Sequence, residues 1–359
     1  MTNDTQERAG CALRNAHALH RAGRLEEARA LCAQALELRP EQPEALILLG
    51  IITAQTGDAA RAVTLFDRAL RLEPRNLPAL LNRGHALGVL KQPAAALDSY
   101  DAAIAIAPDH APAHHEKGKT LAQLRRYEAA VSSQDRALAL RPDYAAAHFD
   151  RVSALLELAR HRDALESLDR LIALSPRHPG AWYLRGNTLY GMGHLQAALE
   201  SYGQALALSP GDARAWHNRA NTLFLLGHPA EAAASYDRAI ALDSELKSSY
   251  GERLHARMHI ADWRDFASEL ARLTALIERG EAVCNPFTLL GLCGSPALQR
   301  QAAGTWVRER HPPDGALGPL PARSKREKLR IGYFSAEFHG HATASLTAEL
   351  FEVHDRARL

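Results

Sequence analysis

The residues best placed for chemistry lie in one short stretch near the end of the chain, KLRIGYFSAEFHGHATASL at residues 328–346. Alternating apolar residues and β-favouring side chains over 329–334 predict a strand. The polar loop that follows holds Glu337, His339 and His341, and then a helix begins. In α/β sheets, binding and catalytic sites are built in loops at the carboxyl ends of strands. Taken alone, however, the residues favour an ordinary loop histidine at position 341.

A second group, His110, His114 and His115, suggests a metal site. His114 occupies the same position in a repeating pattern as Trp182 and Trp216, so packing explains it. Structural zinc sites usually need about four converging ligands, and the four cysteines are scattered without a CxxC pair. P-loop, HExxH and GxSxG motifs do not occur in the sequence. We therefore expect that this chain binds neither a metal nor a cofactor.

These histidines belong to a long pattern with a period of about 34 residues, a length typical of helical repeats. Six prolines keep that spacing: Pro40, Pro74, Pro108, Pro142, Pro176 and Pro210. Small residues dominate a second column: Ala16, Gly50, Gly84, Gly118, Val152, Gly186 and Ala220. Large side chains recur in a third: Phe66, Tyr100, Leu168, Tyr202 and Tyr236. The period and the residue types predict pairs of antiparallel helices, because small residues let one helix approach the next and large residues fill the remaining gap.

Glycine and proline mark where these helices end. Gly23, Gly57, Gly193 and Gly227 fall where the first helix of a pair stops, and glycine adopts the left-handed conformation of such a position most easily. Each proline ends the second helix, because it lacks an N–H donor and its ring clashes with the preceding turn. The whole pattern resembles the tetratricopeptide repeat, in seven copies over residues 9–246.

Such repeats stack into a superhelix whose first helices line a concave surface. One column of this surface contains Ile47, Leu81, His115, Phe149, Tyr183 and His217, and the next contains Asn82 and Asn218. An asparagine side chain offers both a donor and an acceptor, which suits the backbone of an extended peptide. A solvated helix face is the simpler interpretation of any one of these residues, but the groove as a whole predicts peptide or protein binding.

The rest of the chain changes character. Residues 247–311 predict a helical connector, with Phe266, Leu270 and Leu273 on one helical face. Residues 312–327 are rich in proline and glycine and predict a linker. Residues 328–359 predict the first βα unit of a further α/β lobe. We therefore expect a mainly all-α chain that ends in this unit.

Composition limits the choice of partner and compartment. The formal net charge is +2, which gives no global reason to expect nucleic acid or anionic membrane as a partner. The N-terminus has no apolar segment of the kind that signal peptides carry. The longest apolar run, at 45–54, is shorter than the roughly 20 residues that span a membrane. The sequence thus predicts a cytoplasmic protein that interacts with other proteins.

The order of segments also resembles a known enzyme family. The repeats are followed by HARMHIADW (255–263), by NPF (285–287) and by LRIGYFSAEFHGHATASL. This order is similar to that of the protein O-linked N-acetylglucosamine transferases (O-GlcNAc transferases) and their bacterial relatives. In that family a tetratricopeptide-repeat superhelix precedes a two-lobed glycosyltransferase of the GT-B type.

The resemblance implies a function and two kinds of site residue. It implies transfer of N-acetylglucosamine from UDP-N-acetylglucosamine to Ser or Thr hydroxyls of proteins held by the repeats. It implies an acceptor-site role for His341, and it places Asn82 and Asn218 in the family's peptide-holding asparagine ladder. That column holds other residues elsewhere, namely Leu48, Glu116, Asp150 and Leu184. The ladder is therefore broken in this chain.

Two hypotheses follow. In the first, the chain is the N-terminal portion of such a transferase, truncated shortly after the catalytic domain begins. Because the second lobe mainly holds the nucleotide-sugar in this family, the first hypothesis predicts that the chain alone is inactive. In the second, the chain is a non-catalytic repeat scaffold for protein–protein interaction.

Overall fold

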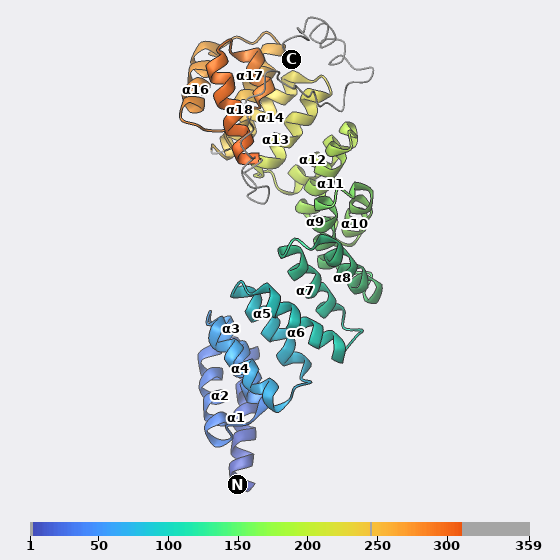
Figure 1. Cartoon of the computed structure of the whole chain (residues 1–359), viewed down its shortest axis with the longest axis vertical. Helices are drawn as coiled ribbons and strands as arrows, with labels where there is room; N and C mark the ends of the chain where they lie inside the picture. Colours follow the sequence, from blue (N-terminus) through green and yellow to red (C-terminus); the bar gives the residue numbers. More distant parts are fainter. Residues whose placement is uncertain (1–2, 245, 311–359) are drawn as a thin grey trace, which may run out of the picture. The chain divides into compact units, whose positions relative to one another are not determined.

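The computed structural model describes residues 3–244 and 246–310. All regular secondary structure in these residues is helical (Figure 1). The predicted linker at 312–327, the predicted βα unit at 328–359 and His341 lie outside them. The first fourteen helices form seven consecutive antiparallel pairs: α1 (Asn3–Arg21) and α2 (Leu25–Leu38), α3 (Pro43–Gln55) and α4 (Ala59–Leu72), α5 (Leu77–Val89) and α6 (Pro93–Ile106), α7 (Ala111–Gln123) and α8 (Tyr127–Leu140), α9 (Ala145–Glu157) and α10 (His161–Leu174), α11 (Pro179–Gly191) and α12 (Leu195–Leu208), α13 (Ala213–Leu225) and α14 (Pro229–Leu242).

The helix ends lie where the glycines and prolines of the repeat predicted them. The helices α4, α6, α8, α10 and α12 each end two residues before a repeat proline. Gly23, Gly57, Gly193 and Gly227 all have a positive φ, from 74° to 96°. The same column continues through Lys91, Arg125 and Ala159, whose φ values are 56°, 57° and 55°. The turn between the paired helices therefore keeps one backbone geometry even where a side chain makes that geometry costly.

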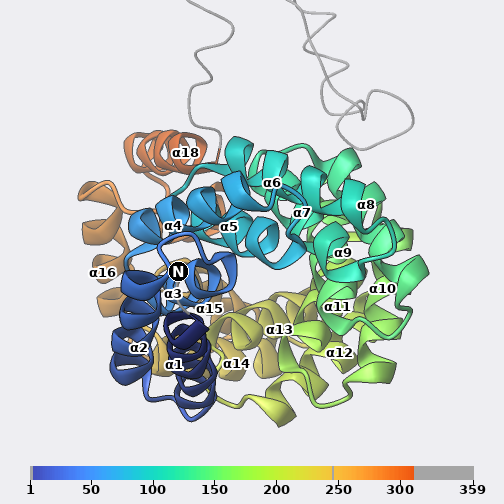
Figure 2. The ribbon, with the colours of Figure 1, turned by 90° about the horizontal axis from the view of Figure 1, so that it is seen from below.

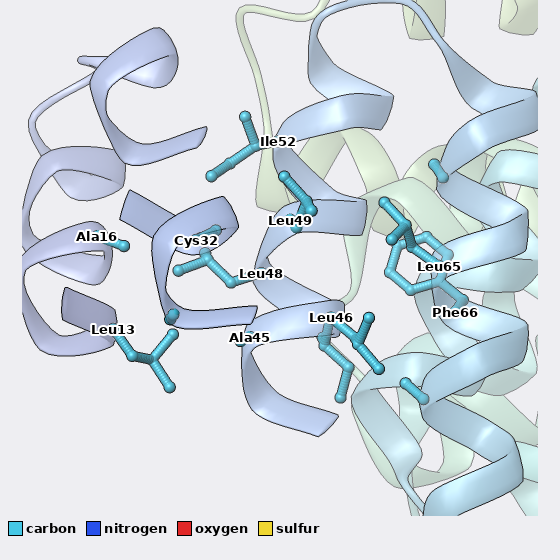
Figure 3. Close-up of a cluster of buried hydrophobic side chains, with 14 of the residues drawn as sticks. Leu13, Ala16, Cys32, Ala45, Leu46, Leu48, Leu49, Ile52, Leu65 and Phe66 are labelled. Atoms are coloured by element: carbon cyan, nitrogen blue, oxygen red, sulfur yellow. The ribbon is translucent and has the colours of Figure 1, made fainter. Parts of the chain in front are cut away.

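In the pairs α3–α4, α5–α6 and α11–α12, the small residue of the first helix lies against the large aromatic residue of the second. A Cβ atom placed on Gly50 would lie 2.6 Å from the Phe66 ring, and one on Gly84 would lie 2.6 Å from the Tyr100 ring. The period of the small and large columns thus sets how closely the two helices approach. Because α3 packs between two neighbouring pairs, its apolar run is buried all round, and Leu46 and Ile52 are fully inaccessible in the core of Figure 3.

Polar contacts join each pair to the next. From α5 to α15, every first helix carries a basic residue at the same repeat position. It lies 16 positions after a residue of the preceding second helix and 16 positions before a residue of the following second helix. We call this set the cation ladder: Arg83, Lys117, Arg151, Arg185, Arg219 and Arg253. Arg83, for example, donates to Asp67 at 2.7 Å and to Ser99 at 2.7 Å. The ladder bridges adjacent pairs at partly buried positions.

Four helices follow the seventh pair in the described residues, and the first of them continues the repeat pattern. They are α15 (Ser248–His259), α16 (Phe266–Glu278), α17 (Pro286–Leu292) and α18 (Pro296–Arg310). Arg253 of α15 is the last member of the cation ladder and contacts Asp237 and Glu269. Ala261 follows Gly227 by one repeat period and also has a positive φ, of 53°. The backbone pattern therefore extends one step beyond the predicted boundary at residue 246.

The connector has an apolar core of its own. Tyr250, Leu273, Ile277 and Leu289 are among its buried residues. Gly251 lies against Cys284, so closely that an added Cβ would come within 2.2 Å of the cysteine Cβ. The residues Met1–Trp306 form one compact unit. Among the helices over 3–310, none combines the length and the hydrophobicity needed to cross a bilayer.

Candidate functional site

The predicted groove residues lie on the first helices of successive pairs. Figure 2 shows α9, α11 and α13 on the inner side of α8, α10 and α12 within the unit Met1–Trp306. The inner helices carry all six candidates: Asn82 on α5, His115 on α7, Phe149 on α9, Tyr183 on α11, and His217 and Asn218 on α13. The structure separates these candidates into two polar groups and two isolated residues.

The first group, the amide cluster, consists of Tyr183, Asn187, His217, Asn218 and Asn221. The Nδ2 atom of Asn218 donates to Asn187 Oδ1 at 2.8 Å and to Tyr183 Oη at 3.2 Å. Asn221 Nδ2 donates to His217 Nε2 at 3.1 Å. Because Nε2 accepts this bond, the His217 ring carries its proton on Nδ1, which lies 2.8 Å from Ser249 Oγ.

Two buried tyrosines hold the amide cluster from behind. Tyr202 Oη donates to Asn187 Oδ1 at 2.8 Å, and Tyr236 Oη donates to Asn221 Oδ1 at 2.5 Å. Burial raises the pKa of both phenols above the usual value, so both remain neutral donors. The same tyrosines fill the space against the small residues of α11 and α13. Core packing therefore fixes the orientation of the asparagine amides.

This arrangement leaves hydrogen-bonding capacity unused. Within the described residues, Asn218 Oδ1 and Asn187 Nδ2 have no hydrogen-bond partner. The first is an acceptor and the second is a donor, and both side chains are only half-buried. A peptide unit presents one N–H donor and one C=O acceptor. The cluster can therefore bind a peptide backbone without reading its side chains.

The second group, the charged cluster, consists of His85, His115, Glu116, Lys119 and Asp150. Glu116 lies 3.6 Å from His85 Nε2 and 3.2 Å from Lys119 Nζ. His115 Nε2 lies 3.6 Å from Asp150 and 4.0 Å from Glu116. Burial raises the pKa of Asp150, while the adjacent His115 and Lys119 oppose that rise. This part of the groove can pair with charged side chains.

His115 supports the groove more than it lines it. The residue is 5% exposed, and its Nδ1 lies 3.1 Å from Gln134 Oε1. Gln134 stands in the column that elsewhere holds Phe66 or Tyr100, and it also donates to the His115 carbonyl at 3.2 Å. Tyr144 covers the imidazole, with ring centroids 4.8 Å apart. His115 therefore positions Asp150 and offers little surface of its own.

Asn82 and Phe149 join neither cluster. Asn82 Nδ2 donates to the carbonyl of Pro78 in its own helix, at 2.8 Å. Phe149 packs against His178, with ring centroids 5.5 Å apart. The two asparagines predicted as remnants of one ladder therefore have different surroundings, and only Asn218 belongs to a polar network.

His114 has a structural role. Its Nε2 lies 2.8 Å from the Pro108 carbonyl oxygen, and Trp182 donates to the Pro176 carbonyl at 3.0 Å in the same way. His110 caps α7, because its Nδ1 accepts from the Ala113 N–H at 3.2 Å. These contacts explain two of the three neighbouring histidines as parts of the repeat turn, and for His114 the shared position with Trp182 predicted this role.

Two residues of the amide cluster were not predicted from the sequence. Asn187 and Asn221 are one repeat period apart, in the column that also holds His85 and Lys119. They lie one helical turn after positions 183 and 217, so they share the same face of each inner helix. A search for polar residues in neighbouring columns of the repeat would have found them.

Comparison with known proteins adds the family. A sequence model described as the tetratricopeptide repeat matches residues 13–78, 54–111, 81–145, 115–179, 149–191 and 183–246. Comparison with curated proteins gave no match. These repeat matches together span residues 13–246, well over half of the chain.

Solved structures show a similar fold. PilW, described as a widely conserved type IV pilus biogenesis factor, aligns with a TM-score of 0.52 at 22% identity, over 56% of this chain and 94% of its own. A tetratricopeptide repeat protein from Parabacteroides merdae ATCC 43184 aligns with a TM-score of 0.51 at 18% identity, over 69% of this chain and 98% of its own. At these identities the likeness concerns the fold alone. Together with the repeat matches over 13–246, it leads to one conclusion: the chain belongs to the tetratricopeptide repeat family.

Proposed function

We propose that the chain is a protein-interaction module whose concave groove binds an extended polypeptide segment. The observation that carries the proposal is the amide cluster, in which Asn218 Oδ1 and Asn187 Nδ2 have no partner within the described residues while buried tyrosines fix the amides. Stacked helical repeats provide long concave surfaces of the kind that extended partners occupy. The charged cluster on α5, α7 and α9 adds a second contact point, which selects among partners by charge.

A peptide-selection experiment tests this proposal. A random-peptide display library is selected against the whole chain, and the dissociation constants of the selected peptides are measured by fluorescence anisotropy. The double variant Asn187→Ala/Asn218→Ala should weaken binding about ten-fold or more, because two backbone hydrogen bonds are lost. Asn15→Ala on α1 is the matched control, since Asn15 is an exposed asparagine that belongs to neither cluster. Unchanged affinity in the double variant would refute the proposal.

The sequence also predicts a more specific function, in which the repeats deliver proteins to an N-acetylglucosamine transferase. This prediction depends on residues 328–346, including His341, which lie outside the described residues. The two other segments of the resemblance lie in the connector, where Asn285 caps α17 through the Phe287 N–H and His255 packs against Phe224. These contacts are structural, so the interaction module has the stronger support.

Incubation of the chain with UDP-N-acetylglucosamine and acceptor proteins checks the enzymatic prediction separately. We expect no sugar transfer by this chain, as the resemblance implies. Mass spectrometry of the acceptors would detect a transferred N-acetylhexosamine. Its appearance would show that this chain is sufficient for catalysis, and it would leave the peptide-binding proposal unaffected.

A further inference from the structure

A cavity of about 510 Å³ is lined by residues of α8, α9 and α10 and of the turn between α8 and α9. Leu138 and Leu174 form apolar parts of its wall, and His148 and Arg151 line it from α9. The residues that α9 contributes to the concave groove are different ones, Phe149 and Asp150. The cavity is therefore separate from the site of the proposed function.

The cavity opens here because this repeat lacks one feature of the repeat before it and one feature of the repeats after it. Position 148 holds histidine, as position 114 does one repeat earlier, whereas the following repeats hold the larger Trp182 and Trp216. One repeat earlier, Arg136 reaches across the corresponding groove and pairs with Asp109 at 3.1 Å. The equivalent residues in this repeat are Arg170 and Asp143. No ion pair joins these two residues in the described part of the chain, and both line the cavity.

His148 presents an acceptor that nothing satisfies. Its Nε2 lies 3.0 Å from the Pro142 carbonyl oxygen, which can only accept, so the proton of the neutral ring is on Nε2. Nδ1 then carries a lone pair, and it is buried without a hydrogen-bond partner. The residue as a whole is 8% exposed. An unsatisfied buried acceptor is costly, so a ligand that donates to it gains from the contact.

The charges around the cavity favour a cation. Arg151 is already engaged by Asp135 at 2.6 Å and by Ser167 at 2.5 Å. The remaining charged groups of the lining are the carboxylates of Asp143 and Glu166 and the guanidinium of Arg170. The remaining carboxylates of the lining thus outnumber its remaining guanidinium by two to one, and the apolar wall beside them suits a methylene stem.

We propose that this cavity binds the side chain of an arginine presented by a partner protein. A guanidinium carries five N–H donors in one plane, so it can serve Asp143, Glu166 and His148 Nδ1 together, whereas an ammonium is a compact point charge. The three methylene groups of the arginine lie against Leu138 and Leu174. This contact is independent of the concave groove, so the array can bind two segments of a partner at once.

The test uses N-acetyl-arginine amide as the probe and follows the chemical shifts of the folded chain by NMR. N-acetyl-citrulline amide, which has nearly the same shape without the charge, is the matched ligand control. Three variants separate the site from general effects. His148→Trp introduces the residue of two other repeats and fills part of the cavity. Asp143→Asn/Glu166→Gln removes the charge of both carboxylates. Asp109→Asn alters the equivalent position one repeat earlier.

We expect the arginine probe to bind about ten-fold more tightly than the citrulline probe, because a hydrogen bond from a charged donor lowers the dissociation constant by about that factor or more. His148→Trp and the double carboxylate variant should each lose binding, while Asp109→Asn should retain it. Equal binding of the two probes, or binding that survives His148→Trp, would overturn the proposal. Tighter binding of free arginine than of the blocked probe would overturn the assignment to a protein side chain.

Discussion

Single residues carry backbone strain in three of the seven repeat turns. Lys91, Arg125 and Ala159 occupy the left-handed conformation that glycine occupies at the equivalent positions. For a residue with a Cβ atom this conformation costs about 1 kcal/mol or more. The strain persists because the helix pair on either side of the turn fixes the backbone between them.

Ala159→Gly should therefore raise the free energy of unfolding by about 0.5–1 kcal/mol, since the native φ of 55° no longer opposes a side chain. Urea unfolding followed by circular dichroism measures the change. The reverse substitution at an equivalent turn, Gly193→Ala, is the matched control and should lower stability by a similar amount. A loss of stability in Ala159→Gly would contradict the argument.

His110 makes the stability of the fourth repeat depend on pH. Burial, together with the nearby Arg141 and His114, lowers the pKa of His110 below the usual value near 6.5. The neutral ring caps α7 through Nδ1, and protonation would remove that acceptor. Because the folded pKa is lower than the unfolded pKa, the unfolded chain binds more protons between the two values. The contribution is thus complete above about pH 6.5 and is lost as the pH falls through the lowered pKa.

The variant His110→Asn tests this dependence, because asparagine caps the equivalent helix α5 at Asn76 and does not titrate. Between pH 7.5 and pH 5, the wild-type chain should lose up to about 1 kcal/mol more stability than the variant, which is the usual worth of a cap. The comparison removes the contribution of the other histidines, which both chains share. Identical pH profiles for the two chains would show that the cap does not titrate.

At the scale of elements, the cation ladder has one incomplete rung. Arg219 donates to Ser235 at 2.6 Å, as other members do to their serines. The position that holds an aspartate in the preceding rungs, however, is Gly203 here. Space is available there, since a Cβ on Gly203 would meet no atom within 4 Å. The junction between α12 and α13 therefore lacks an ion pair that Asp169 and Arg185 make at 2.9 Å one repeat earlier.

Gly203→Asp should complete the rung and raise the free energy of unfolding by about 1 kcal/mol, from helix propensity and a partly exposed ion pair together. Gly203→Asn is the matched control, because it supplies a similar side chain without the charge. The ionic part is the difference between the two variants, and it should disappear in the Arg219→Ala background and decrease in high salt. A difference that persists without Arg219 would exclude the ion pair as its source.

At the scale of the whole molecule, the stability of each helix pair depends on its contacts with the neighbouring pairs. Each helix pair contacts the pairs beside it, as in other repeat arrays, so a local defect should loosen its surroundings first. Arg253 joins the seventh pair to the connector. Its side chain is 10% exposed and contacts both Asp237 and Glu269.

Arg253→Ala should therefore uncouple the connector from the repeats, with a cost of about 3 kcal/mol or more for the buried pair that is broken. Hydrogen exchange should accelerate in α14–α16 and remain unchanged in α1–α4. Arg83→Ala, at the same ladder position, is the matched control and should accelerate exchange around α4–α6 instead. Uniform acceleration along the array in either variant would contradict nearest-neighbour coupling.

The sequence by itself determined the helical pairs and their ends. The constant repeat period, the prolines after the second helices and the glycines after the first helices are local signals, because each acts on the backbone of its own turn. The sequence also placed Tyr183, His217 and Asn218 on the first helices of their repeats, where the structure groups them in the amide cluster. The same pattern predicted a function in protein interaction, and the matches to the tetratricopeptide repeat family support this prediction.

Only the tertiary structure decided which polar residues work together. Asn218 reaches Asn187 across 31 positions, whereas Asn82, in the same column, bonds within its own helix. The buried His115 contacts Gln134, which stands where other repeats have an aromatic residue, and the cavity at His148 lies where the following repeats hold a tryptophan. Such contacts depend on the shapes of residues in neighbouring helices. Repeat periodicity fixes the position of a side chain, but the packing around it fixes its partners.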